Sequence, residues 1–205
     1  CSPKKNDYGF ENRNITHYIY APIEDSYIRQ KWRLKDKSLE ARSIPKNIAQ
    51  VYTLSPGSDF NRKSKKDFNF LLSKFNFAID KGFSEVGLLF DDIDINNIGI
   101  ESDDKDLGKF HGELISEVTT KLGLSNGWFC PSIYCESFSK KGIQNDKYLE
   151  GVSETINNDL FFLWTGPKVI SDFISQDHLK ELGQVINNPV VIWDNFYAND
   201  YCPTR

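Results

Sequence analysis

Two adjacent carboxylates, Asp91 and Asp92, directly follow the apolar run EVGLLF. Carboxylates this close repel each other, so one of them tends to hold its proton near neutral pH and can then act as a general acid. Capping of a following helix by either aspartate explains the same residues equally well. The pair therefore indicates either a catalytic site or a helix N-terminus at the end of a strand.

A calcium loop is a second interpretation of this segment. Asp92, Asp94 and Asn96 stand at alternating positions, as the ligands of an EF-hand loop do. Such a loop needs Gly at its sixth position and Glu at its twelfth, where this chain has Asn97 and Asp103. We therefore predict no metal site here, and no cofactor.

Tryptophan followed by small or polar residues ends two further apolar runs, in WTG and in WDNFYANDY. Flat aromatic faces beside groups that bind hydroxyls are typical of a carbohydrate pocket. This interpretation makes Trp193, Asn195 and Asp200 candidate binding residues. The alternative is that Trp164 and Trp193 are core residues and that Asn195 and Asp200 form turns.

Tyr134, which follows FCPS, is a further candidate, because its hydroxyl can bind a reacting group, although a buried tyrosine is just as often structural. The three histidines, His17, His111 and His178, lie on a predicted strand and on predicted helices. They have neither the spacing of a metal site nor a neighbouring serine motif. We interpret all three as structural or surface residues.

Six short β-rich apolar runs, with helical patterns between them, must position these residues. The runs cover residues 15–20, 48–54, 85–90, 127–132, 160–165 and 189–193, and the helical patterns residues 65–82, 105–123 and 168–186. Alternating strands and helices form a parallel sheet. Polar and aromatic residues follow the runs, and no phosphate-binding glycine motif does. This favours an α/β fold of the (β/α)8 TIM-barrel type over an open nucleotide-binding sheet.

The composition is that of a globular chain, with 205 residues, 39% hydrophobic residues and a formal net charge of -4. An acidic balance without a long basic run argues against nucleic acid or an anionic membrane as the main partner. No stretch approaches the roughly 18 apolar residues that a membrane span needs. The four cysteines lack zinc-site spacing, so we expect free thiols in a reducing compartment.

Taken together, the motifs YIYAPIEDSY, SPGSDF, LLFDDID, CPSIYC, WTGPKVIS and VIWDNFYANDY resemble the catalytic domain of glycoside hydrolase family 84, the O-GlcNAcase family. They occur in the family's order. The resemblance implies a partial catalytic barrel over residues 15–205, with about strands two to seven of eight, after an unmatched segment at 1–14.

The resemblance also implies a function: hydrolysis of β-linked N-acetylglucosamine from Ser and Thr of glycoproteins in the cytoplasm and nucleus. The family retains configuration, and the sugar's own acetamido oxygen is the nucleophile and forms an oxazoline. Carried across, Asp91 orients the acetamido N–H and Asp92 is the general acid and then the general base. Tyr134 supports the acetamido group. Asn195 and Asp200 bind sugar hydroxyls, Trp193 walls the pocket, and no metal is implied.

The chain departs from the family at several positions. The family has a sugar-binding Lys after YAP, and this chain has Ile23, which cannot donate a hydrogen bond. The family's first strand, which ends in GFYG, and its last strand have no match here, and the first helix is reduced to about residues 38–47. These departures favour an alternative, an inactive fragment or pseudoenzyme that binds O-GlcNAc proteins. A hyaluronidase-like hexosaminidase is a further alternative.

Overall fold

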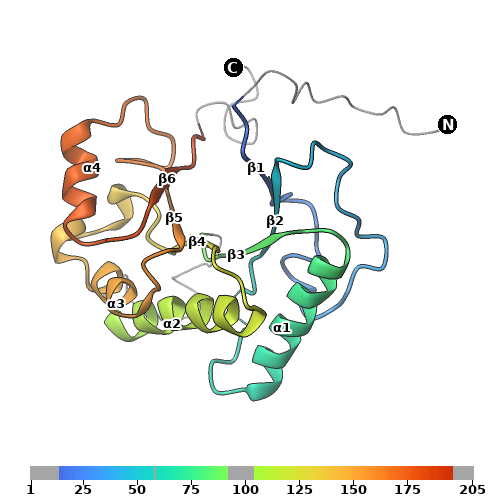
Figure 1. Cartoon of the computed structure of the whole chain (residues 1–205). Helices are drawn as coiled ribbons and strands as arrows, with labels where there is room; N and C mark the ends of the chain where they lie inside the picture. Colours follow the sequence, from blue (N-terminus) through green and yellow to red (C-terminus); the bar gives the residue numbers. More distant parts are fainter. Residues whose placement is uncertain (1–13, 58, 92–103, 196–205) are drawn as a thin grey trace.

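Six parallel strands make one curled sheet in the computed structural model, which describes residues 14–57, 59–91 and 104–195. The strands are hydrogen-bonded in chain order, and they form an open arc with the helices around its outer side (Figure 1). They are β1 (His17–Tyr20), β2 (Ala49–Leu54), β3 (Glu85–Leu89), β4 (Trp128–Cys130), β5 (Phe161–Trp164) and β6 (Val190–Ile192). All six predicted strands are confirmed, and the sheet is a half-barrel of the α/β type.

Four α-helices follow β2, β3, β4 and β5 in turn. They are α1 (Lys65–Asp80), α2 (Lys105–Leu122), α3 (Lys147–Thr155) and α4 (Gln176–Gly183), and two short 3-10 helices, η1 (Glu136–Phe138) and η2 (Ile143–Asn145), precede α3. A side chain caps each α-helix at its first turn by accepting a backbone N–H, as Asp104 does from Leu107. The two predicted helices at 65–82 and 105–123 are confirmed.

Three helix predictions need correction. The pattern at 168–186 is helical only from Gln176, because Ser175 caps the helix there and residues 165–171 form a turn around the Lys168 carbonyl. The short helix expected near 38–47 is absent, and residues 21–48 consist of turns and bends. Helix α3 was not predicted, although Asp146 caps it and Leu149 and Val152 are buried at helical spacing.

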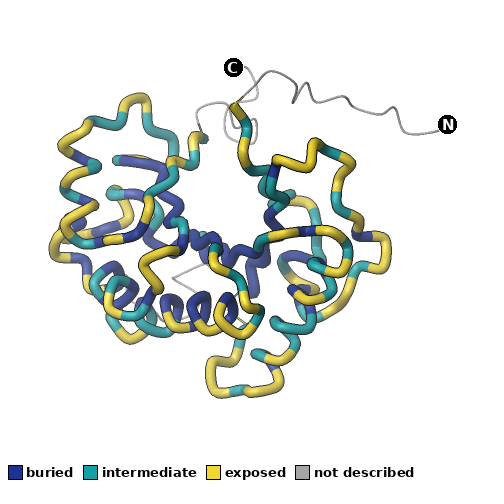
Figure 2. The backbone as a smooth tube through the Cα atoms, viewed as in Figure 1, coloured by how far each residue is buried: buried dark blue, intermediate teal, exposed yellow. Residues whose placement is uncertain are grey.

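Side chains alternate between the two faces of the sheet, because successive residues of a strand point in opposite directions. On β3, Val86 and Leu88 join the large core between the sheet and the helices, and Leu89 joins a smaller cluster with Val51 and Cys130. The larger core lies on the outer side of the arc, so the smaller cluster marks its inner face. Buried residues line the strands and the helix sides that face them (Figure 2).

Two basic side chains, buried Lys74 and half-buried Arg33, hold the long connection from β1 to β2 in place. Lys74 of α1 is about 1% exposed, and its Nζ donates to the carbonyls of Tyr27, at 2.9 Å, and of Leu34. Burial lowers the pKa of Lys74 to about 8. Arg33 binds the carboxylates of Asp59 and Asp67, and the Arg33–Asp67 contact is 2.7 Å. These bonds replace the missing helix as the support of the loop.

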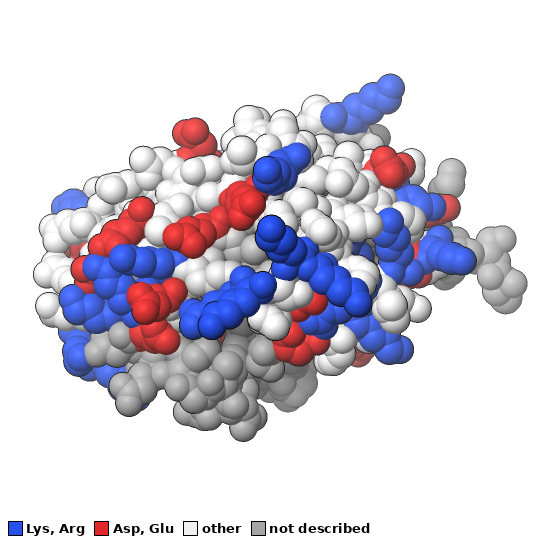
Figure 3. Space-filling view, turned by 90° about the horizontal axis from the view of Figure 1, so that it is seen from below, with Lys and Arg blue, Asp and Glu red and all other residues white. Residues whose placement is uncertain are grey.

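Acidic and basic side chains are interspersed on the face seen from below, where α2 and α3 lie (Figure 3). Lys105 contacts both Glu150 and Glu154, and Lys109 contacts Glu154 at 2.9 Å. These pairs join the two helices, and each is at least one-third exposed, so each contributes little to stability. Among the described residues, no helix has the length and hydropathy of a membrane span.

Candidate functional site

Asp91 lies at the carboxyl end of β3, where the strand direction turns its side chain toward the inner face of the arc. Phe90 belongs to the outer core, and its N–H donates to the carbonyl of Cys130 at 2.9 Å, so the strand pairing continues as far as the residue before Asp91. The next residue then follows Leu89 onto the inner face. A carboxylate therefore stands at the end of a buried strand, as predicted.

The carboxyl group of Asp91 has an electrostatic environment unlike that of a surface aspartate. Its Oδ1 atom is buried and has no hydrogen-bond partner within the described part of the chain. Burial raises the pKa of Asp91, while its own backbone N–H and the charge of Arg29 act in the opposite direction. A buried acceptor without a donor is costly in a folded protein, which makes it a candidate for binding a ligand's N–H or O–H group.

The partner in the predicted pair, Asp92, lies outside the described residues, as do the calcium-loop residues Asp94 and Asn96 and the predicted binding residue Asp200. Among the described residues, burial is the largest cause of the raised pKa of Asp91. The repulsion between adjacent carboxylates that the sequence suggested involves Asp92 and stays a prediction. The assignment of general acid to Asp92 stays a prediction.

Tyr134 and Trp193 pack against the same inner cluster as Leu89 and Cys130. Tyr134 is held by its backbone, since its carbonyl accepts from the N–H of Thr165 at 2.9 Å and from the hydroxyl of Thr165 at 3.3 Å. Both aromatic side chains are half-buried. The fold thus brings two of the predicted aromatic residues to the inner face on which Asp91 lies.

Asn195 is half-buried, and its Nδ2 donates to the carbonyl of Val169 at 3.1 Å. Its amide donor therefore fastens the loop after β5 to the end of β6. The other candidate from that region, Trp164, is a core residue: it is fully buried, and its Nε1 donates to Nε2 of His178 at 2.9 Å. Of the two interpretations of Trp164, the core role is therefore the one that the structure supports.

Arg29 is the functional candidate that the sequence analysis missed. It lies in the loop after β1, its Nε atom is buried, and its charge favours the ionised form of Asp91. The backbone carbonyl of the preceding residue, Ile28, accepts from the N–H of Ser55 at 2.7 Å, just after β2. Because Arg29 and Asp91 come from segments far apart in the sequence, only the sheet order brings them together.

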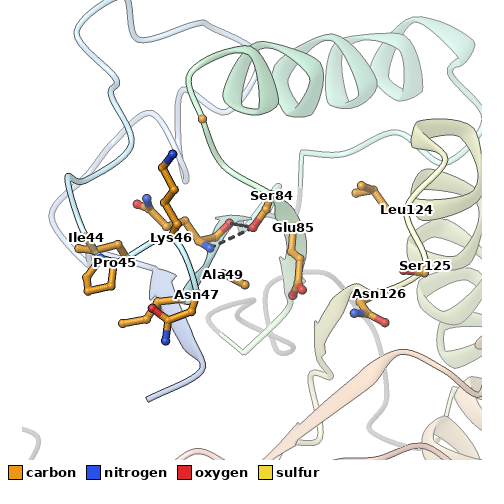
Figure 4. A pocket seen from close by; sticks show the side chains of 13 residues that line it. Ile44, Pro45, Lys46, Asn47, Ala49, Ser84, Glu85, Leu124, Ser125 and Asn126 are labelled. Carbon is orange, nitrogen blue, oxygen red and sulfur yellow. Dashed lines mark hydrogen bonds between the residues drawn. The ribbon is translucent and has the colours of Figure 1, made fainter. Parts of the chain in front are cut away.

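A hollow of about 660 Å³ opens at the amino ends of the strands (Figure 4), whereas Asp91 follows the carboxyl end of β3. Its lining comes from residues that precede or begin β2, β3 and β4, namely 44–50, 82, 84, 85 and 124–126. Glu85 lies in this lining, and its carboxylate accepts from Nε1 of Trp128 at 2.6 Å. Active sites of α/β barrels lie at the carboxyl ends of the strands, so this hollow is not the candidate site.

No group of three or more His, Cys, Asp and Glu side chains in the described ranges is arranged to hold a metal ion. Cys130 and Cys135 are free thiols, both buried. The chemistry that the described site offers is therefore that of a buried carboxylate beside aromatic side chains.

Comparison with known sequences finds one matching family model and named relatives. The family model described as beta-N-acetylglucosaminidase matches residues 7–205. Protein O-GlcNAcase of Rattus norvegicus is 33% identical over an alignment 203 residues long, which covers 93% of this chain and 22% of that protein. The Mus musculus protein of the same name gives the same values. The chain thus spans 22% of the length of these curated relatives.

Solved structures share the fold. A mutant of the O-GlcNAc hydrolase of Thermobaculum terrenum has a TM-score of 0.71 at 23% identity, over 91% of this chain and 42% of that one. The protein CpGH84B has a TM-score of 0.75 at 24% identity, over 91% of this chain and 34% of that one. These likenesses extend to the half-barrel as a whole.

Proposed function

Because the chain belongs to the beta-N-acetylglucosaminidase family of glycoside hydrolases, we propose that it removes β-linked N-acetylglucosamine from Ser and Thr of glycoproteins in the cytoplasm and nucleus. The observation that carries this proposal is the buried Oδ1 of Asp91, which has no hydrogen-bond partner among the described residues and lies on the inner face that also holds Tyr134 and Trp193. An acetamido N–H is a donor of the kind this oxygen lacks.

Asp91 has the task of orienting the substrate's acetamido group. Its carboxylate accepts the acetamido N–H, which turns the acetamido oxygen toward the anomeric carbon and increases the electron density on that oxygen. Burial raises the pKa of Asp91, and a bound N–H donor favours the ionised form, so substrate binding itself promotes the charge state that the reaction needs. The charge of Arg29 acts in the same direction.

Asp92 completes the mechanism. The acetamido oxygen attacks the anomeric carbon, the bond to the Ser or Thr oxygen breaks, and Asp92 gives its proton to that leaving oxygen. The acetamido group keeps its N–H on Asp91, so the intermediate is a protonated oxazoline. A water molecule then attacks its anomeric carbon, the bond from that carbon to the acetamido oxygen breaks, and Asp92 takes the water's proton, so the product retains its configuration. This division of tasks comes from the family resemblance and rests on the neighbouring position of the two acids in the sequence.

The remaining side chains hold the sugar. Tyr134 and Trp193 offer aromatic surface for the acetamido methyl group and the sugar ring, because both pack on the inner cluster while staying half-buried. Asn195 holds the loop after β5 through its Nδ2 donor, and we assign its amide oxygen, with the carboxylate of Asp200, to the sugar hydroxyls.

A binding-only function is the second candidate, and Ile23 is the observation that favours it. The Ile23 side chain is 64% exposed in the turn after β1, so it fills no core position that explains its presence. Without the lysine expected there, the sugar loses one charged hydrogen bond, which contributes about 1.5–3 kcal/mol in proteins. The loss of this bond weakens the hold on the sugar during the reaction, which favours a chain that binds glycoproteins without hydrolysing them.

The test is hydrolysis of aryl β-N-acetylglucosaminides by the whole chain and its Asp92→Asn variant. We expect the variant to lose most of its activity on substrates with poor leaving groups and little on activated aryl glycosides, because acid assistance matters least there. Equal losses on both substrate classes would remove Asp92 from the acid role. Folded wild-type chain that binds the sugar without hydrolysing it would favour the binding-only function.

A further inference from the structure

Behind the candidate site, two buried side chains join the strand that carries Asp91 to the loop that carries Tyr134. They are His111 of α2 and Tyr148 of α3, each at most 3% exposed. Nδ1 of His111 lies 2.9 Å from Oη of Tyr148. The same Oη accepts the backbone N–H of Ser132 at 3.0 Å, two residues before Tyr134.

Both side chains of this pair are uncharged at neutral pH, because burial raises the pKa of Tyr148 and lowers that of His111. The N–H of Ser132 can only donate, so the hydroxyl of Tyr148 accepts there, and a second hydrogen bond joins the same hydroxyl to Nδ1 of His111. Burial lowers the pKa of His111 to about 3, which is consistent with a neutral ring.

The imidazole of His111 also contacts the end of β3, the strand that leads to Asp91. Its ring stacks on the ring of Phe90, with 3.8 Å between the centroids and 8° between the planes. Phe90 is the residue immediately before Asp91. One hydrogen-bonded pair therefore contacts the residue that precedes Asp91 and the segment that precedes Tyr134.

Close packing of α2 on α3 makes this arrangement rigid. A Cβ atom on Gly108 would lie 2.0 Å from the backbone oxygen of Tyr148, and one on Gly151 would lie 2.1 Å from that of Lys105. The two helix backbones therefore come close together at Tyr148 and in the two turns of α2 before His111. Because both side chains are also buried, this close packing leaves them little room to shift.

We propose that His111 and Tyr148 are positioning residues of the glycosidase site, which hold the end of β3 and the loop before Tyr134 in one fixed relation. The inference rests on the proposed function, because it is the acetamido group that both sides of the site must reach together. Neither residue touches the substrate in this proposal. They act through Phe90 and Ser132.

The first test is kinetic. Tyr148→Phe keeps the ring and removes the hydroxyl, and we expect kcat on an aryl β-N-acetylglucosaminide to fall about tenfold, the factor for one hydrogen bond, with a smaller change in KM. If Tyr148 acts through Tyr134, adding Tyr134→Phe to Tyr148→Phe has little further effect. His111→Phe keeps the stack on Phe90 and the bond to Ser132, so we expect a smaller loss of about threefold.

Ser116→Ala is the matched control. The hydroxyl of Ser116, also on α2, accepts the N–H of Asn157 at 2.8 Å in the segment before β5, away from the site. We expect Ser116→Ala to lower the melting temperature and to leave kcat and KM unchanged. If Tyr148→Phe behaves like this control, or if its effect and that of Tyr134→Phe multiply independently, the positioning role is wrong.

The second test does not depend on activity. Amide hydrogen exchange at Ser132 in the whole chain is expected to be about tenfold faster in Tyr148→Phe, because its N–H then has no buried acceptor. Ser116→Ala speeds exchange at Asn157 instead. Unchanged exchange at Ser132 overturns the proposal. A third outcome separates the two claims. If the wild-type chain hydrolyses nothing but Tyr148→Phe still exchanges faster at Ser132, the proposed function is rejected and the coupling between Tyr148 and the loop is supported.

Discussion

Asp91 and Cys130 lie beside each other at the carboxyl ends of β3 and β4. Burial raises the pKa of the Cys130 thiol, and the charge of Asp91 raises it further. The thiol is therefore protonated at neutral pH. It donates weakly to the carbonyl of Pro131, with 3.9 Å between Sγ and the oxygen, and the Oδ1 atom of Asp91 has no donor within the described ranges.

Replacing this thiol by a hydroxyl is expected to change the charge state of Asp91. Cys130→Ser places a stronger donor beside the carboxylate, and a new hydrogen bond to the ionised form lowers the pKa of Asp91. We expect the acidic limb of the profile of kcat/KM against pH to move down by about 0.5–1 pH unit. Cys135→Ser is the control, because the Cys135 sulfur lies 3.2 Å from the Ser137 hydroxyl instead. A shift in both variants, or in neither, would contradict the assignment.

Introducing the missing lysine is expected to strengthen catalysis. The side chain of Ile23 is 64% exposed, so Ile23→Lys disturbs no packing. One charged hydrogen bond to the sugar raises kcat/KM by about tenfold or more. Glu24→Lys adds the same charge at the adjacent position and is expected to have little effect. Equal gains from the two variants would indicate a general effect of charge.

Buried Lys74 makes stability depend on alkaline pH. Its pKa is lowered from 10.5 to about 8 in the folded chain, so between these values the unfolded chain binds more protons and stability rises with pH. We expect urea unfolding to show a gain of up to about 1 kcal/mol per pH unit in this window. Lys74→Met removes that slope, although it also leaves the carbonyls of Tyr27 and Leu34 without their donor. The same slope in both proteins would assign it to other groups.

The close contact between α2 and α3 predicts unequal effects of two Gly→Ala changes. At Gly108 the new methyl group would meet the Tyr148 carbonyl at 2.0 Å, whereas at Gly183 nothing lies within 4 Å. We expect Gly108→Ala to lower the free energy of unfolding by about 2 kcal/mol or more. Gly183→Ala, near the end of α4, is neutral or stabilising by up to about 1 kcal/mol. Thermal melts of both variants measure these effects. A Gly108→Ala variant as stable as the wild type would contradict the close contact between α2 and α3.

The strands could be predicted from the sequence because short β-rich runs bounded by turn residues have few other structures available. The helix before β6 was predicted too long, since the apolar residues at 169–174 resemble a helical pattern although Ser175 begins the helix. Helix α3 was missed because nine residues give a weak periodic signal.

The site was predictable where it depended on one segment. A carboxylate after a buried strand is visible in the sequence, and the alternation from Leu89 also predicts the face on which Asp91 lies. The contribution of Arg29 and the pair of His111 and Tyr148 depended on long-range packing. His111 was interpreted as structural or surface, and its contact with Phe90 shows that it is buried beside the end of β3.

The most direct test of the account is kcat/KM for an aryl β-N-acetylglucosaminide, measured on the whole chain and on Asp91→Asn. Asp177→Asn is the control, because the Asp177 side chain is 91% exposed on α4. We expect Asp91→Asn to lose about 100-fold or more, the usual cost of removing one preorganised polar group, with its melting temperature preserved or raised because a buried charge is gone. Hydrolysis at the wild-type rate by folded Asp91→Asn would contradict the central claim.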